Sequence, residues 1–163
     1  MTGRGVPVTE TLLLALWIGA ALLFAIVVAP AAFSVLPTRT LAGALVGRVL
    51  PVIFYAGVVI GSLIVILDLM GKTGSWARTA AGAVSALACA IAQLVVGTRI
   101  DRLRAAIGGP LDALALDDPR RIAFGQLHAI SVGWLGVALL AAIIALALAV
   151  RSLPPRNEQI LNR

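Results

Sequence analysis

Four long stretches of the sequence contain no aspartate, glutamate, lysine or arginine. They cover residues 11–38, 49–67, 79–98 and 122–150. A helix needs about 20 apolar residues to cross the hydrocarbon core of a bilayer, and these runs are of that length or longer. The runs are continuous rather than alternating, and lipid admits only helices or closed barrels. The sequence therefore predicts an all-α, polytopic membrane protein with four transmembrane helices.

The composition supports this class. Hydrophobic residues make up 61% of the 163 residues and charged residues only 12%, whereas a soluble domain has about 45–50% apolar residues. The net charge is +6, but the basic residues are too sparse to form the dense stripe of a nucleic-acid-binding protein. We expect the lipid bilayer, and no nucleic acid, as a partner. The single cysteine, Cys89, excludes a disulfide within the chain and a cysteine-rich metal site.

The first stretch has an alternative interpretation as a cleavable signal peptide, with Arg4 as its basic start. Its apolar run is longer than the roughly 7–15 residues of a signal-peptide core, so we interpret it as a membrane span. This span contains Pro30, where a helix would kink or end.

The connections predict an antiparallel four-helix bundle in one domain, residues 1–163. The second and third spans are joined by a short polar turn around Lys72 and must be neighbours. Gly108 and Pro110 are expected to stop the third helix, while Asp118 and Pro119 form an N-cap and first-turn pair for the fourth.

We expect the spans at roughly residues 11–34, 48–69, 78–106 and 119–150. Their even number puts both termini on the same side of the membrane. The thirteen Lys and Arg residues divide into seven on the opposite side and six on the side of the termini, so the positive-inside rule leaves the orientation open. The six are Arg4, Lys72, Arg78, Arg151, Arg156 and Arg163.

Small residues mark the faces on which membrane helices pack, because lipid supplies little hydrophobic driving force between helices. Gly57 and Gly61 form a GxxxG pattern in the second span. The third span carries a four-residue repeat of small or polar side chains: Ala81, Ser85, Cys89, Gln93 and Gly97. We expect Gly57, Gly61, Ser85 and Gly97 to pack helices within the bundle; contact with another subunit is the alternative.

Polar side chains at membrane depth form the candidate site. His128 and Ser131 lie in the fourth span, and the helical rise puts His128 at the depth of Gln93 on the third. One interpretation is an interhelical hydrogen-bonded cluster of His128, Ser131, Gln93 and Cys89. The other is a ligand or proton site built from the same residues. Asp68 closes the second span beside Lys72, and we expect its carboxylate to reach the membrane surface.

No enzymatic motif is visible. The sequence has one histidine and no CxxCH, which argues against bis-histidine or covalently attached haem. One histidine and one cysteine are too few for a closed metal site. No Ser/His/Asp order, P-loop, GxGxxG or HExxH occurs. We therefore expect no enzyme activity, no catalytic residue, no cofactor and no metal.

Two groups of residues carry a resemblance to a known family. They are Phe24, Pro30, Phe33, Leu36, Ala42, Gly43 and Phe54, and Phe124, Leu127, His128 and Ser131. On these residues the chain resembles a bacterial family of uncharacterised four-helix membrane proteins, similar to transmembrane-protein-205-like domains. The resemblance covers residues 12–150 and implies a multi-pass bundle of the bacterial inner membrane with no assigned enzymatic activity. Ala129 and Leu135 stand where the family pattern has glycine and asparagine.

Two functions are compatible with these features. The first is a non-catalytic integral membrane subunit that packs on and stabilises a larger membrane protein complex of the respiratory or photosynthetic type. The chain has almost no extramembrane mass, which favours this hypothesis. The alternative is a small carrier or channel for a metal ion or small solute that uses His128 and Gln93.

Overall fold

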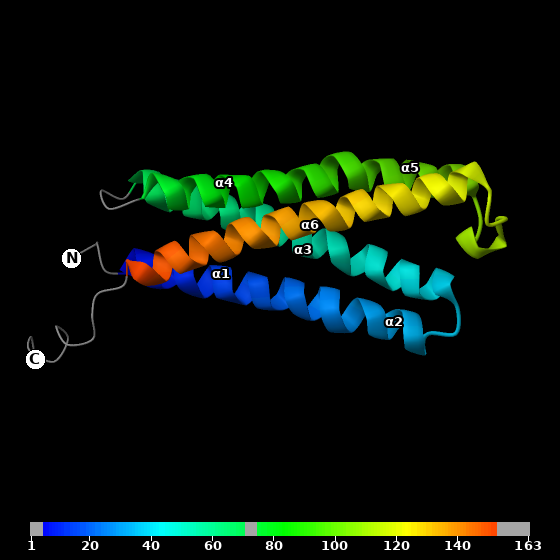
Figure 1. Ribbon diagram of the computed structural model, residues 1–163, viewed down its shortest axis with the longest axis horizontal. Helices are drawn as coiled ribbons and strands as arrows, with labels where there is room; N and C mark the ends of the chain where they lie inside the picture. Colours follow the sequence, from blue (N-terminus) through cyan, green and yellow to red (C-terminus); the bar gives the residue numbers. More distant parts are fainter. Residues whose placement is uncertain (1–4, 71–74, 153–163) are drawn as a thin grey trace, which may run out of the picture.

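The computed structural model describes residues 5–70 and 75–152 (Figure 1). Each charge-free stretch lies in a long helix, apart from residues 36–38, which follow the first helix. Within the described residues, four helices are long and apolar enough to cross a membrane: Val8–Val35, Arg39–Met70, Trp76–Ile107 and Pro119–Arg151. They pack against one another as an all-helical antiparallel bundle. The protein is an integral, multi-pass membrane protein, as the sequence predicted. The predicted turn around Lys72 lies outside the described residues.

The first helix passes through Pro30 instead of ending there. It consists of α1 (Gly5–Leu23), the π-helical segment η1 (Phe24–Val28) and α2 (Ala29–Val35). The wider π-helical turn directly precedes Pro30, which lacks an N–H and would crowd a normal α-helical turn. The helix ends at Leu36, whose extended backbone (φ −74°, ψ 141°) is the conformation preferred before a proline.

The second helix, α3 (Arg39–Met70), starts nine residues earlier than expected from residue 48. Arg39 and Arg48 are both exposed, so neither charge is buried by extending the helix. A charge-free run therefore marks the apolar centre of this helix and underestimates its length.

The third helix changes its winding halfway along. It consists of α4 (Trp76–Ala90), the π-helical segment η2 (Ile91–Gly97) and α5 (Thr98–Ile107). The hydroxyl of Thr98 donates to the carbonyls of Leu94 and Val95, two of the backbone groups in the π segment. Gly108, with a positive φ of 66°, ends α5, as the sequence predicted, because glycine adopts this left-handed conformation without steric cost.

A short 3-10 helix, η3 (Leu111–Ala113), follows, and the fourth helix is α6 (Pro119–Arg151). The Asp118 carboxylate accepts a hydrogen bond from the backbone N–H of Arg120 at 2.8 Å, which confirms the predicted N-cap. The Arg120 side chain and this backbone bond hold the pKa of Asp118 below its ordinary value.

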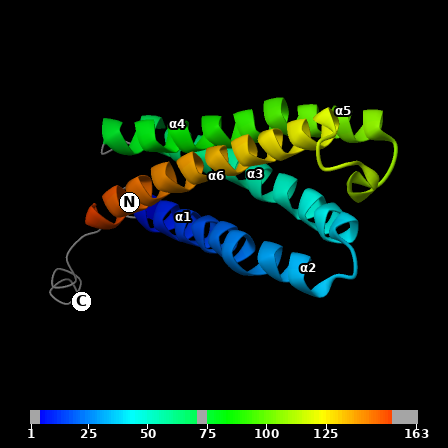
Figure 2. The ribbon, with the colours of Figure 1, turned by 45° about the vertical axis from the view of Figure 1, so that its right-hand side comes forward.

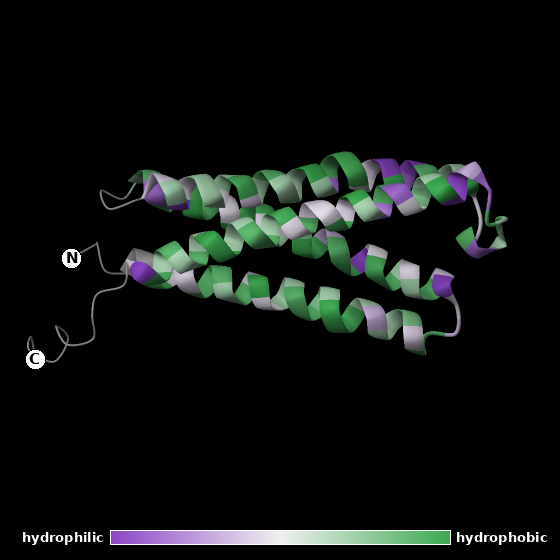
Figure 3. Ribbon diagram, in the orientation of Figure 1, coloured by the Kyte–Doolittle hydropathy of each residue, from purple (hydrophilic) through white to green (hydrophobic). Residues whose placement is uncertain are grey.

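The beginning of α1 and the end of α6 lie at the same end of the bundle (Figure 1). The turned view shows α1 and α2 along one side, with α4 and α5 beside α6 on the other (Figure 2). The middle of the bundle is mostly apolar, and most of the strongly hydrophilic residues lie toward its two ends (Figure 3).

Small side chains bring the helices into close contact. A Cβ at Gly61 would lie 2.8 Å from the carbonyl oxygen of Gly82, and one at Gly57 would lie 2.5 Å from the Cys89 sulfur. Both glycines therefore lie where α3 touches α4. Ser85 joins α4 to α6, because its hydroxyl donates to the Ala138 carbonyl at 3.1 Å. On α6 the fully buried residues are alanines: Ala138, Ala142, Ala145 and Ala149.

Charged residues are buried where the helix ends meet near the chain termini. Arg78 on α4 binds the Asp68 carboxylate on α3 through Nε and Nη2, and its Nε lies 3.4 Å from Glu10 on α1. The Nη1 of Arg78 also donates to the Ser152 hydroxyl, just after α6, at 3.2 Å. We refer to Glu10, Asp68 and Arg78 as the ion cluster.

The ion cluster corrects one prediction. Asp68 is only 5% exposed, so the expectation that it reaches the membrane surface was wrong. A buried carboxylate requires a paired cation, and Arg78 supplies it from the neighbouring helix. Lys72, which lies near Asp68 in the sequence, is outside the described residues.

Candidate functional site: a cleft at the loop end of the bundle

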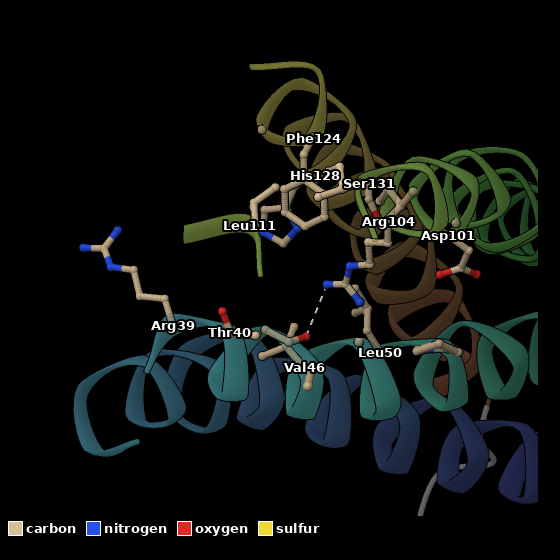
Figure 4. A pocket seen from close by; sticks show the side chains of 18 of the residues that line it. Arg39, Thr40, Val46, Leu50, Asp101, Arg104, Leu111, Phe124, His128 and Ser131 are labelled. Carbon is tan, nitrogen blue, oxygen red and sulfur yellow. Dashed lines mark hydrogen bonds between the residues drawn. The ribbon is translucent and has the colours of Figure 1, made fainter. Parts of the chain in front are cut away.

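A cleft of about 550 Å³ lies at the end of the bundle opposite the ion cluster (Figure 4). Its walls are α3 on one side and η2, α5 and α6 on the other, with Phe33 of α2 and Leu111 of η3 at the rim. This volume is typical of pockets that hold one small ligand. We refer to this space as the loop-end cleft.

The outer part of the loop-end cleft is polar. Arg39, Thr40, Asp112 and Arg121 line it where the helices meet the loops. The Thr40 hydroxyl donates to Asp112 at 3.1 Å and so ties α3 to η3. The Arg121 guanidinium donates to the Leu114 carbonyl at 2.9 Å. These bonds fix the loop against the helix ends.

Arg104 extends from α5 across the cleft toward α3 (Figure 4). Its Nη2 donates to the Gly43 carbonyl at 3.3 Å, and its guanidinium carbon lies 5.2 Å from the centre of the Phe124 ring. A Cβ at Gly47 would lie 2.7 Å from its Nη1. The two glycines of α3 thus leave the space that the guanidinium occupies, and the aromatic face of Phe124 stabilises its charge.

The Arg104 guanidinium has no acidic partner in the described part of the chain, where the ion pairs involve Arg78 and Arg120. Its hydrogen bond to a backbone carbonyl leaves the positive charge uncompensated. Arg104 lies in the last turn of α5, and its side chain is exposed to the cleft. An unpaired guanidinium that lines a cleft can offer its donors to a carboxylate or a phosphate. The position of Arg104 therefore favours a site for a negatively charged group.

Three of the four residues proposed for the polar site lie in the loop-end cleft: His128, Ser131 and Gln93. No hydrogen bond between described residues links His128 to Gln93 or to Ser131. The imidazole instead stacks on Phe124, with parallel rings whose centres are 6.4 Å apart. The fourth residue, Cys89, is fully buried and packs against α3 outside the cleft.

The inner part of the cleft is mostly apolar, and its polar lining residues are Gln93 and Ser131. Leu50, Pro51 and Phe54 of α3 and Ala92 of η2 line it. Phe54 is 1% exposed and Ala92 fully buried, so they form the floor. Gln93 extends toward the loops, since its Nε2 lies 3.4 Å from the Cβ position of Gly97 one turn further on. The cleft is therefore polar at its mouth and apolar at its floor.

Arg39, Arg104 and Phe124 line the cleft but were not among the predicted site residues. The spacing of Gly43 and Gly47, four residues apart on α3, could have indicated this site. Two glycines on one face of a helix leave room for a long side chain from a neighbouring helix. His128 and Phe124 show the same four-residue spacing on α6.

The titratable groups of the cleft are mainly arginines and aspartates. Within residues 5–70 and 75–152, no three His, Cys, Asp or Glu side chains lie close enough to hold a metal ion. The lining groups include three arginines, two aspartates and one imidazole. Of the three arginines, Arg104 and Arg121 donate to backbone carbonyls.

A known protein-family model matches the part of the sequence that contains the first three spans. The sequence model of the domain of unknown function DUF4149 matches residues 12–108. No curated protein and no solved structure matches the chain. The matched region contains the α3 and α5 walls of the loop-end cleft, including Arg104, while His128 and Ser131 follow it. Since the match covers more than half of the chain, the protein belongs to the DUF4149 family.

Proposed function

We propose that the protein is a membrane-embedded, non-catalytic binding protein or carrier for a small solute and that the loop-end cleft is its binding site. One observation carries the proposal: a cleft of about 550 Å³ contains the guanidinium of Arg104, which lacks an acidic partner in the described chain. His128 and Gln93, the residues first proposed for a carrier, line the same space.

The test fills the cleft without disturbing the packing of the bundle. Gly125 lines the cleft and Gly133 does not, although both lie on α6 and neither would bring a Cβ within 4 Å of another group. Gly125→Phe adds a ring to the cleft, and Gly133→Phe adds the same ring outside it. The two substitutions therefore form a matched pair.

The measurement is native mass spectrometry of each protein after mild detergent extraction from the membrane in which it was made. We expect a bound small molecule on the wild type and on Gly133→Phe, and loss of that molecule from Gly125→Phe. Equal occupancy in the two variants would place the bound molecule elsewhere. A bare chain in all three proteins would argue against a stable solute site.

A second candidate function is that of a subunit in a larger membrane protein complex. Ala129, Gly133 and Gly136 form an exposed small-residue face on α6, and a Cβ at either glycine would meet nothing within 4 Å. Such a face allows close approach by a helix of another protein. The same mass spectra test it, because Gly133→Phe would then release a partner protein that Gly125→Phe retains.

We also propose, on the resemblance to transmembrane-protein-205-like domains, that the membrane is the bacterial inner membrane. Fractionation of inner and outer membranes tests this location. Recovery in any other fraction would contradict it.

A further inference from the structure

We propose that the ligand of the loop-end cleft is an anionic amphiphile with a single acyl chain, drawn from the surrounding bilayer. In this arrangement its oxyanion head binds Arg104, and its chain lies along α3 toward Phe54. The inference rests on the proposed function, because it names the ligand class of the same cleft.

The charge of the cleft carries the first step. Arg39, Arg104 and Arg121 line it together with Asp101 and Asp112. Asp112 is engaged by the Thr40 hydroxyl, and Arg121 by the Leu114 carbonyl. Asp101 lies one turn before Arg104 on α5, and the ion pairs of the described residues do not include it. The three arginines exceed the two aspartates by one positive charge, and the unpaired guanidinium of Arg104 is where an anion is favoured.

The donors of Arg104 carry the second step. A guanidinium has five N–H donors in a fixed planar arrangement that matches carboxylate and phosphate oxygens. Among the described residues, Arg104 has one hydrogen bond, to the Gly43 carbonyl. The guanidinium lies against the Phe124 ring, and the absence of a side chain at Gly47 leaves room for it. The remaining donors are available to an oxyanion.

The polarity of the cleft carries the third step. Its lining changes from Thr40 and Arg39 at the mouth to Leu50, Pro51 and Phe54 further along α3. From Gly47, beside the Arg104 guanidinium, to Phe54 the helical rise amounts to about 10 Å, which is the length of α3 along which a chain attached to the bound head group lies. The apolar part accommodates an acyl chain, whereas a soluble anion would leave it empty.

The size of the cleft limits the ligand to one chain. A volume of about 550 Å³ lies in the range of pockets that enclose a single small ligand. A two-chain lipid would have to leave one chain in the bilayer. A fatty acid, or an acyl chain with a phosphate head, has the required charge and shape.

The test uses a photoactivatable analogue of palmitate and the full-length protein in nanodiscs of phosphatidylcholine. After irradiation, labelled peptides are identified by mass spectrometry. We expect labels in residues 40–54 and 121–131. Unlabelled palmitate should compete, whereas hexadecanol, which lacks the charge, and acetate, which lacks the chain, should not.

The variants test the head group contact. Arg104→Gln should lower the affinity for the analogue by about tenfold or more, as expected for loss of a charge-assisted hydrogen bond. Arg48→Gln, which removes an exposed arginine of α3 outside the cleft, should leave it unchanged. If Arg104→Gln does not fold, Gly47→Ala provides a second test, because its Cβ displaces the guanidinium.

The outcomes separate this inference from the proposed function. If Gly125→Phe abolishes labelling but Arg104→Gln does not weaken it, or if hexadecanol competes as well as palmitate, the cleft is a binding site and the anionic head is wrong. Equal competition by acetate would identify the ligand as a soluble anion and would contradict the proposal that it is an amphiphile. Labelling that Gly125→Phe leaves unchanged would contradict both proposals.

Discussion

The guanidinium of Arg78 binds the carboxylate of Asp68 through two of its nitrogens, and both side chains lie inside the bundle. Glu10 completes the ion cluster at 3.4 Å from Arg78, but within residues 5–70 and 75–152 neither of its oxygens has a hydrogen-bond partner. One cation therefore serves two buried carboxylates, and the three residues do not contribute equally to stability.

Removal of the cation should be the most damaging change in the ion cluster. Arg78→Ala leaves Asp68 and Glu10 buried without a counter-charge, and breaking a buried ion pair costs about 3–5 kcal/mol. Asp68→Asn should cost less, since Arg78 keeps Glu10. Glu10→Gln should cost less than about 1 kcal/mol, because a carboxylate without a hydrogen bond already carries a desolvation cost.

Thermal unfolding of the wild type and of the three variants, all in the same detergent, measures this order. Asp117→Asn, a change at an exposed loop residue, is the control. A loss of stability in Glu10→Gln as large as that in Asp68→Asn would show that the two carboxylates contribute equally and would contradict the expected order.

A single methyl group added at Gly61 should weaken the α3–α4 contact and lower the stability of the protein. In Gly61→Ala the new Cβ would lie 2.8 Å from a backbone oxygen and 2.9 Å from the backbone nitrogen of Ala86, so the helices must separate. Overpacking of this kind costs about 1–3 kcal/mol. Gly19→Ala is the matched control, because nothing lies within 4 Å of its Cβ. Unfolding midpoints that fall equally in both would contradict this account.

The single cysteine should be unreactive in the folded protein. Cys89 is 0% exposed, so a maleimide should modify it only after denaturation. Gly125→Cys adds a thiol in the loop-end cleft and should be modified rapidly, with a mass increase of one label. Gly133→Cys, on the outer face of α6, should react more slowly because lipid excludes water there. Intact-protein mass spectrometry follows all three, and rapid labelling of native Cys89 would contradict the packing described.

The N-cap of α6 should show a pH dependence that Arg120 controls. Arg120 holds the pKa of Asp118 below its ordinary value, mainly through the side-chain hydrogen bond. Since the folded pKa is lowered, the stabilisation is present above the ordinary aspartate pKa and is lost as the pH falls through the lowered value. Carbon NMR of the Asp118 carboxyl measures it. In Arg120→Gln the pKa should rise, and an unchanged titration would assign the shift to the backbone bond alone.

Much of the fold could be predicted from local sequence. The charge-free runs located all four helices, and the identities of Gly108 and Asp118 predicted where α5 ends and α6 begins. These features depend on backbone conformation and on groups close in sequence. The ends of α3 were less predictable, because exposed arginines are compatible with a helix that extends beyond the apolar core.

The pairing of distant side chains could not be predicted in the same way. Cys89 and Gln93 are four residues apart and would share a face of an α-helix, but a π segment begins between them at Ile91 and includes Gln93. Its wider turn rotates the following residues. Cys89 therefore faces α3, whereas Gln93 lines the cleft. Nothing in the local sequence marks this change of winding.

The opposite placement of the ion cluster and the loop-end cleft has a consequence for sidedness. Helix α6 ends beside the ion cluster at Ser152, and about 30 Å of helix separates Arg151 from Ser131 in the cleft. A reporter protein fused after α6 therefore occupies the compartment on the other side of the membrane from the cleft mouth. Locating that one reporter also determines the compartment from which the cleft is reached.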